Sequence, residues 1–218
     1  MHIKIFLFAL LLPLFSLLTG ASVRAAEAPV IIDKPVVWSD ERARLAEEYA
    51  QRHYGRAMTE IVPQAVVVHW TAGNTWESAY HHFYRAAASD GTVNYAAHFI
   101  VDRDGTIFRI LPETTMGRHI IGYNWCSVGI ENVGGVGGAE DLTNAQLAAN
   151  IALIRYLHDK YPTIRYVFGH YQQDQARESG LYIEYVAGYR SVKTDPGKIF
   201  MAGLRAALRG DDLLFYDD

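Results

Sequence analysis

Two short apolar runs, each closing on a histidine, limit most strongly what this chain can fold into. Residues 64–70 read QAVVVHW and residues 164–170 read IRYVFGH. Short runs rich in β-branched residues are typical of strands buried in the middle of a sheet. Segments with the spacing of amphipathic helices alternate with such runs, at residues 39–55, 74–88, 142–162 and 196–208. We therefore expect a single α/β domain in which helices flank a central mixed β-sheet.

Local signals place the ends of these elements. Asn74 with Glu77, and Thr143 with Gln146, have the spacing of capping boxes at the starts of two helices. Pro196 is expected in the first turn of the last helix, where proline is favoured. An Asp-Gly pair at positions 104 and 105, between two apolar runs, predicts a β-hairpin.

The first 25 residues are typical of a secretory signal. Lys4 is followed by an apolar run at residues 5–18 and then by small residues, with an expected cleavage after Ala25. The run is short for a membrane span and is interrupted by Pro13. An uncleaved anchor is the alternative. We expect export to the periplasm or the medium, no stable membrane insertion after cleavage, and an N-terminal extension with a helix over residues 26–60.

Charge and cysteine content exclude some classes of partner and of stabilisation. Removing Lys4 and Arg24 with the signal takes the 20 basic residues to 18, against 24 acidic residues, a net charge of −6. Because nucleic-acid binding needs clustered basic side chains, no nucleic-acid partner is expected. Cys126 is the single cysteine, so no disulfide can form within the chain. We expect a monomer.

Histidines at strand ends, together with a carboxylate, suggest a metal site. His69 and His170 close the two apolar runs, and Asp195 follows in the segment KTDPG. Two histidines and one carboxylate form a ligand set that catalytic zinc uses, leaving a fourth position for water. The chain has nine histidines, so this pairing is one among many. A structural role for each histidine stays open at this point.

Five segments occur in an order that resembles a known enzyme family: VVVHWTAGNT, NYAAHFIVDRDGTIFRILPE, GRHIIGYNWCSVGIENVGG, GH and KTDPG. Over residues 60–207 the chain resembles the zinc-dependent N-acetylmuramoyl-L-alanine amidases of type 2, related to phage lysozyme-type amidases and peptidoglycan-recognition proteins. The resemblance implies a catalytic domain over residues 61–210 and one zinc ion in a cleft at one edge of the sheet. It also implies peptidoglycan or a muropeptide as substrate, cut at the amide between N-acetylmuramic acid and L-alanine.

The resemblance also assigns residues. It places the zinc ligands at His69, His170 and Asp195, and the catalytic carboxylate at Glu131. Glu131 would take a proton from water and pass it to the departing amine. Lys193, two positions before the last ligand, would face the same side and stabilise the negative charge of the tetrahedral intermediate.

Other matching positions are expected near the substrate. Phage-type members carry a catalytic tyrosine where this chain has Ala97, with Tyr95 two residues earlier, so the acid–base work should rest on Glu131 and Lys193. The side chains expected to line the cleft or contact substrate are His98, His119, Asn94, Trp76, Tyr123 and Asn124.

One interval departs from the family pattern. His170 and Asp195 lie 25 positions apart, where family members often have about ten between these ligands. Long loops inside a compact domain are usually functional or mobile. We expect residues 172–190 to form a flap over the cleft that shapes substrate choice.

Two other functions fit the same residues. One is a module that recognises muropeptides without cleaving them. The presence of Asp195, Glu131 and Lys193 favours an enzyme over that reading. The other is a zinc hydrolase of the same fold with a different amide substrate, since pocket details decide specificity.

Overall fold

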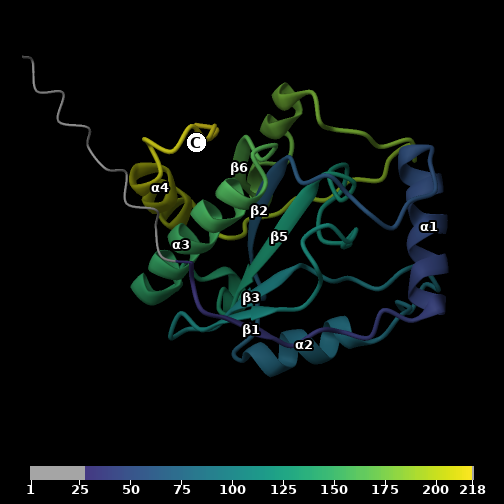
Figure 1. Cartoon of the computed structure of the whole chain (residues 1–218), viewed down its shortest axis with the longest axis horizontal. Helices are drawn as coiled ribbons and strands as arrows, with labels where there is room; N and C mark the ends of the chain where they lie inside the picture. The colour runs from purple at the N-terminus through teal and green to yellow at the C-terminus, as the bar shows by residue number, and fades with distance from the viewer. Residues whose placement is uncertain (1–27, 218) are drawn as a thin grey trace, which may run out of the picture.

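A six-stranded mixed sheet with four α-helices forms the framework of the molecule (Figure 1). The computed structural model describes residues 28–217, so the predicted signal at residues 1–25 lies outside the described residues. The strands are β1 (Ile31–Asp33), β2 (Ala65–Trp70), β3 (Phe99–Val101), β4 (Ile107–Arg109), β5 (Ser127–Asn132) and β6 (Tyr166–Gly169). The helices are α1 (Asp40–Tyr54), α2 (Trp76–Tyr84), α3 (Asn144–Lys160) and α4 (Lys198–Ala207). The predicted α/β class is confirmed.

Strand β2 lies between β5 and β6 and runs parallel to both. The order across the sheet is β1-β4-β3-β5-β2-β6, and only β3 and β4 pair antiparallel among the described strands. That pair is the predicted hairpin, turned at Gly105 with a φ of 88°. The register places His69 opposite Glu131 and Val68 opposite Gly169. The register therefore fixes which side chains meet where the central strands end.

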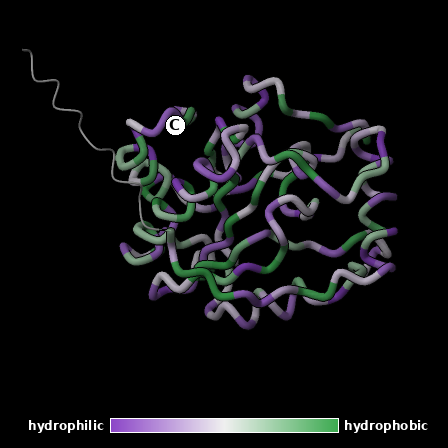
Figure 2. The backbone as a smooth tube through the Cα atoms, in the orientation of Figure 1, coloured by the Kyte–Doolittle hydropathy of each residue, from purple (hydrophilic) through white to green (hydrophobic). Residues whose placement is uncertain are grey.

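The two faces of the sheet pack against different elements. Helices α3 and α4 cover one face, where Val66, Val68 and Ile130 join Leu153 and Leu204 in one buried cluster. In Figure 1 these two helices lie together over the sheet, and Figure 2 shows hydrophobic residues following the strands beneath them. Side chains alternate along a strand, so His69 and Glu131 point to the other face. Within residues 28–217, no helix is long and apolar enough to cross a membrane.

Two predicted helix starts are confirmed. The Ser39 side chain accepts from the Arg42 N–H at the start of α1, which ends at Gly55 in the left-handed region (φ 73°). The Thr143 and Gln146 side chains form the predicted capping box of α3. Such reciprocal bonds satisfy N–H groups that a helix leaves unpaired.

Two other helix starts differ from the prediction. The Thr75 hydroxyl, not Asn74, caps α2 by accepting from the Ser78 N–H at 3.2 Å, so the predicted box with Glu77 does not form. Helix α4 begins after Gly197, which leaves Pro196 outside its first turn. At α2 both Asn74 and Thr75 are residues that favour caps, and Thr75 forms the cap. Gly197, directly before α4, makes no side-chain cap.

His98 has a structural role in the interior of the protein. Its side chain is fully buried, its Nδ1 accepts from the Gly129 N–H at 2.9 Å, and its Nε2 donates to the Thr115 carbonyl at 2.8 Å. Both ring nitrogens are therefore satisfied in the neutral form. Burial lowers the pKa of His98 to about 4, because a charged ring there would lose its hydration.

This burial predicts an acid-sensitive fold. In the unfolded chain His98 is protonated below about pH 6.5, but in the folded chain only below about pH 4. Because the unfolded chain binds the extra proton between these values, the free energy of unfolding falls as the pH falls through this window. We expect His98 to contribute a loss of roughly 3 kcal/mol in the free energy of unfolding by pH 4. Urea unfolding of metal-free protein at pH 7.5 and pH 4 would measure it. His98→Gln keeps a donor and an acceptor but does not titrate. Its free energy of unfolding should fall by roughly 3 kcal/mol less than that of the wild type between pH 7.5 and pH 4. An equal fall in both proteins would contradict this role of His98.

Candidate metal centre

Three potential ligand atoms converge where β2 and β6 end. His69 Nδ1 lies 3.0 Å from His170 Nδ1 and 3.2 Å from Asp195 Oδ2, and the third side, from His170 Nδ1 to Asp195 Oδ2, is 3.1 Å. All three residues are buried. His69 comes from β2, His170 follows β6, and Asp195 lies just before α4. The predicted set is therefore brought together from three separate parts of the chain.

The three separations fit a shared cation better than hydrogen bonds. Three hydrogen bonds would need three hydrogens, but each imidazole Nδ1 carries at most one and an ionised carboxylate carries none. A tetrahedral zinc with bonds of about 2.0–2.1 Å holds its ligand atoms roughly 3.3–3.4 Å apart. His69, His170 and Asp195 would hold such an ion with little movement.

The protonation of the ligands also suits a cation. Burial opposes ionisation of Asp195, but the adjacent rings of His170 and His69 outweigh it and hold the pKa of this carboxyl below its usual range. Burial lowers the pKa of His170 to about 4, which keeps the ring neutral near pH 7. A neutral imidazole and an ionised carboxylate are the forms that bind metals.

His119 fixes the orientation of the first ligand. Its Nε2 lies 3.3 Å from the Ser127 carbonyl, an acceptor, so Nε2 carries the hydrogen of the neutral ring. Burial holds the pKa of His119 well below its usual value. Its Nδ1, 3.1 Å from His69 Nε2, must then accept, which leaves the lone pair of His69 Nδ1 facing the other two ligands.

Gly129 makes room for that ring. A Cβ at this position would lie 2.7 Å from His119 Nδ1, closer than real Cβ atoms approach. Gly129 is thus needed to accommodate the buried ring of His119, which supports a ligand. His119 also lines the cavity, so the substrate contact predicted for it stays a prediction.

Glu131 presents a carboxyl group beside the cluster. It lies opposite His69 in the parallel register, and among residues 28–217 its buried Oε2 has no hydrogen-bond partner. Burial raises the pKa of Glu131 to about 7, against the opposing influence of His69 and Lys193. A carboxyl group poised near neutrality can accept and return a proton.

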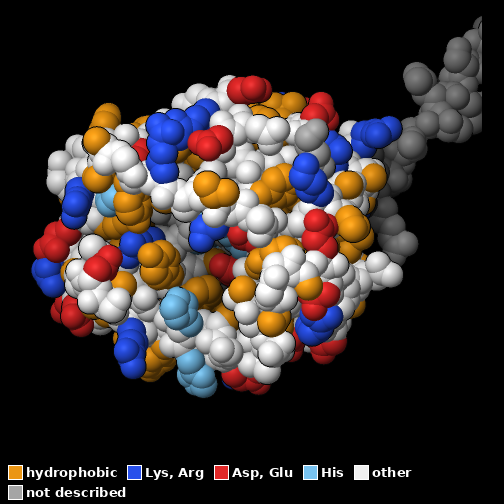
Figure 3. Space-filling model, turned by 180° about the vertical axis from the view of Figure 1, so that it is seen from behind, with side chains coloured by type: hydrophobic (Ala, Val, Ile, Leu, Met, Phe, Trp, Pro, Cys, Tyr) orange, Lys and Arg blue, Asp and Glu red, His pale blue; other side chains and the backbone are white. Residues whose placement is uncertain are grey.

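The cluster opens into a cavity of about 720 Å³. Figure 3 shows a hollow near the middle of this face, with basic and acidic side chains visible inside it. Glu131 and Lys193 both line the cavity, as do the three ligands. Lys193 forms no ion pair with the described residues, so its ammonium group is free to approach a substrate.

Most of the predicted substrate contacts have other roles. Trp76 stacks on Phe108 with ring centroids 4.1 Å apart, and the Tyr123 hydroxyl donates to the Gln173 carbonyl at 2.8 Å. The Asn94 amide donates to the His82 carbonyl at 2.7 Å. Together with His98, these side chains do not line the cavity. The prediction of substrate contact is corrected to packing for Trp76, Tyr123, Asn94 and His98.

Asn124 lines the cavity but is committed to the backbone. Its Oδ1 accepts from the N–H groups of His119 and Ile120, both at 2.8 Å, and its side chain is fully buried. This contact holds the turn that presents His119 to His69, so Asn124 has a supporting role, and the substrate contact predicted for it stays a prediction.

Among the cavity residues that the sequence analysis gave no role are Tyr49, Tyr95, Arg118 and Tyr189. Arg118 stands directly before His119, so its place beside a matched histidine was a usable signal. Tyr49 lies on α1, outside the segments that resemble the family, and nothing local points from it to the site.

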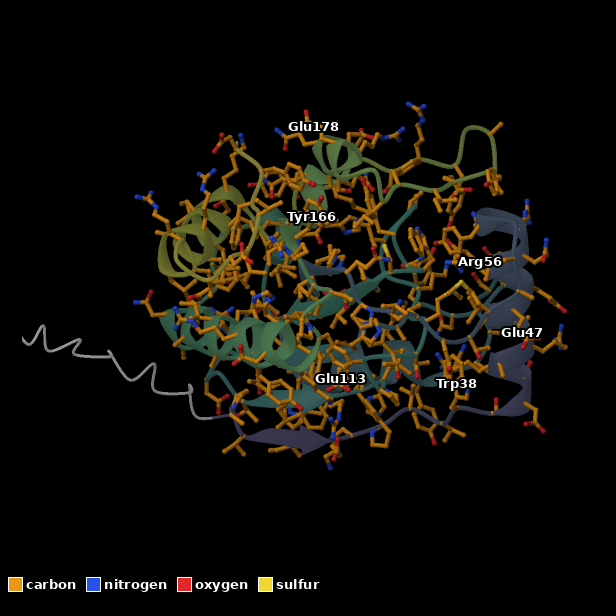
Figure 4. All side chains as sticks on the ribbon, turned by 45° about the horizontal axis from the view of Figure 1, so that its top comes forward. Trp38, Glu47, Arg56, Glu113, Tyr166 and Glu178 are labelled. Atoms are coloured by element: carbon orange, nitrogen blue, oxygen red, sulfur yellow. The ribbon has the colours of Figure 1, made fainter. Side chains whose placement is uncertain are left out.

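Part of the segment predicted to form a flap, residues 172–190, belongs to a tethered strap, and its effect on substrate choice stays a prediction. We use the name strap for residues 180–194, which run from the short helix bearing Glu178 to the end of α1 near Arg56 and return to the site (Figure 4). His53 Nδ1 lies 2.8 Å from the Glu184 carboxylate, and the Tyr185 N–H donates to the His53 carbonyl. Tyr189 and Lys193 of the strap line the cavity. The strap therefore forms a wall of the site.

Comparison with known proteins identifies the family. Residues 59–198, which are 140 of the 218 residues, match the family described as N-acetylmuramoyl-L-alanine amidase. This chain belongs to that family. The match covers all three residues of the metal cluster and Glu131, and it leaves α1 outside.

Two phage endolysins are relatives of this amidase-family chain. The endolysin of Enterobacteria phage K11 is 36% identical over 76 residues, which make up 33% of this chain and 50% of the endolysin. That of Klebsiella phage KP32 is 37% identical over 75 residues, with the same two shares. The matched part of the chain spans half the length of these curated relatives.

A solved structure has the same fold. The endolysin N-acetylmuramoyl-L-alanine amidase LysCS from Clostridium intestinale URNW has a TM-score of 0.55 to this chain. The comparison covers 84% of this chain and 98% of LysCS at 22% identity. The likeness extends to most of the described sheet and helices and concerns the fold.

The support that His119 gives to His69 predicts a metal-binding defect. We expect His119→Phe, which keeps a ring but loses both nitrogens, to weaken zinc binding about 10–100-fold. Competition with a chromophoric chelator would measure the affinity. His82→Phe is the matched control, because His82 lines the cavity but is exposed on α2. Unchanged zinc affinity in His119→Phe would refute the supporting role.

Proposed function

We propose that this protein is a zinc-dependent hydrolase that cleaves the amide between N-acetylmuramic acid and L-alanine in peptidoglycan or its fragments. The observation that carries the proposal is Glu131, whose buried Oε2 has no hydrogen-bond partner within residues 28–217, beside a three-residue metal cluster. A module that only recognises muropeptides has no need of a carboxyl group with a pKa near neutrality. Family membership supports the substrate class.

The residues of the cavity divide the chemistry between them. Bound zinc would polarise the scissile carbonyl and make a coordinated water acidic enough to attack near pH 7. Glu131 accepts the proton of the attacking water and delivers it to the departing alanine nitrogen. Lys193, on the strap, stabilises the negative charge that develops on the carbonyl oxygen. His119 keeps His69 in the tautomer that the site needs.

Export belongs to the same proposal. Its support is the sequence of residues 1–25, with a basic start, an apolar run and small residues before Ala25. We propose a periplasmic or secreted monomer that acts where peptidoglycan is found.

The reaction predicts a defined set of products. Zinc-loaded protein incubated with a soluble muropeptide should release the sugar acid and a peptide with a new alanine amino terminus, detected by mass spectrometry. A chelator or Asp195→Ala should abolish release, because either removes the metal or one of its ligands. Lys193→Met should lower kcat about 10²–10³-fold, since one charge-stabilising donor is lost. Zinc binding without cleavage of any muropeptide would instead favour the recognition module.

Glu131 predicts the pH dependence. It must be ionised to accept a proton, so kcat/KM should fall tenfold per pH unit below its pKa. That pKa is about 7 without metal, and a bound dication lowers it, so the acidic limb should lie at or below pH 7. Glu131→Gln should cost about 10²–10⁴-fold in kcat and lose the limb while keeping zinc. If kcat/KM of Glu131→Gln still fell at acidic pH as in the wild type, the titrating group would be one other than Glu131.

A further inference from the structure

Arg118 is a buried cation in the wall of the cavity, and its hydrogen bonds all go to neutral groups. Its side chain is 5% exposed. Nη1 donates to the Thr92 hydroxyl at 2.6 Å and to the Val93 carbonyl at 2.7 Å. Nη2 donates to the hydroxyls of Tyr95 and Tyr189, at 3.2 and 3.1 Å. Four donors are used, and the buried Nε has no partner among the described residues.

Among the described residues, the charge of Arg118 has no counter-ion within hydrogen-bond distance. Its nearest carboxylate is that of Asp90, whose Oδ2 lies 4.0 Å from Nη2, beyond hydrogen-bond distance. The Asp90 side chain is 59% exposed, and its Oδ1 already accepts from the N–H and hydroxyl of Thr92. An exposed carboxylate at that distance offsets little of the cost of burying a guanidinium group.

Two tyrosines carry the effect of this charge into the cavity. Because the phenol oxygens of Tyr95 and Tyr189 accept from Arg118, each keeps its own O–H hydrogen to donate elsewhere. Both side chains line the cavity. The Arg118 guanidinium also lies 4.1 Å from the centre of the Tyr95 ring, which holds the cation in place. Two hydroxyl donors backed by a cation are suited to bind an anion.

The place of Arg118, Tyr95 and Tyr189 in the cavity indicates which part of a muropeptide they could contact. Arg118 precedes His119, whose ring contacts the ligand His69, so the group lies in the same cavity as the metal cluster. In a muropeptide the carboxyl group of muramic acid is consumed in the scissile amide, and the N-acetylated sugars are neutral. The free carboxylates therefore lie on the peptide side of that bond.

We propose that Tyr95 and Tyr189, backed by Arg118, form a subsite for a free carboxylate on the peptide part of the substrate. The identity of the peptide rests on the proposed function, whereas the anion preference of the subsite does not. The subsite makes the protein selective for stem peptides whose carboxyl groups are free over those in which the same group is amidated.

Binding measurements test the subsite without relying on turnover. Calorimetry with zinc-loaded Glu131→Gln would compare muropeptides that differ only by a carboxylate or a carboxamide, one peptide position at a time. We expect amidation at one position to weaken binding at least tenfold. In the double variant Glu131→Gln/Arg118→Met the two members of each pair should bind with about equal affinity. The carboxylate form should lose affinity, whereas the carboxamide form should bind almost as it does to Glu131→Gln. Equal affinity for both members of every pair would overturn the proposal.

Matched variants separate the subsite from general effects. Arg44→Met in the same background removes an equal charge from the exposed face of α1, where Arg44 pairs with Glu48, and should keep the preference. If Arg118→Met fails to fold, Tyr95→Phe/Tyr189→Phe keeps both rings and should still reduce the preference at least threefold. An unchanged preference in the tyrosine double variant would overturn the role of the hydroxyls.

Cleavage assays distinguish this proposal from the proposed function. Wild-type protein that cleaves carboxylate and carboxamide substrates equally well would overturn the subsite and leave the amidase standing. Protein that prefers carboxylates in binding but cleaves no muropeptide would support the subsite and refute the amidase.

Discussion

The parallel pairing of β2 with β5 and β6 is the constraint on which the site depends. The register sets His69 beside Glu131 and brings Gly169 next to Val68, so that His170 follows at the same edge. A slip of one residue would turn His69 toward α3 and α4, into the apolar cluster around Val66 and Val68. The packing of those valines therefore fixes the position of the ligands, and the core and the metal centre are specified together.

A chain of neutral imidazoles extends this control away from the metal. His98 holds the Gly129 N–H, and Gly129 leaves space for the ring of His119, which in turn contacts His69. Each ring is buried, and burial keeps His98 and His119 uncharged near neutral pH. Rings that served only to fill space could be replaced by apolar side chains. At His119 the direction of the N–H matters, because it decides which nitrogen of His69 faces the cluster.

The elements and ligands that the sequence predicted are those governed by local pattern. The β-branched runs, the capping box at Thr143 and the Asp-Gly hairpin depend on neighbours in the chain, and each has the predicted form. Matching motifs located His69, His170 and Asp195, which the structure brings together. The roles of the aromatic and amide side chains were harder to predict, because a tryptophan near a site can face the cavity or, as Trp76 does, stack on Phe108. That choice depends on contacts between segments far apart in sequence.

Helix α1 places part of the binding surface outside the segment that defines the family. The match begins at residue 59, yet Tyr49 of α1 lines the cavity and His53 anchors the strap through Glu184. Part of the cavity wall is thus encoded before the matched segment that carries the metal cluster and Glu131. Substitutions in α1 can alter this part of the wall without changing a residue of the metal cluster or Lys193. Proteins that share the metal cluster can therefore differ in substrate preference. The boundaries of a matched segment do not mark the boundaries of the site, since Tyr49 lies outside the match and lines the cavity.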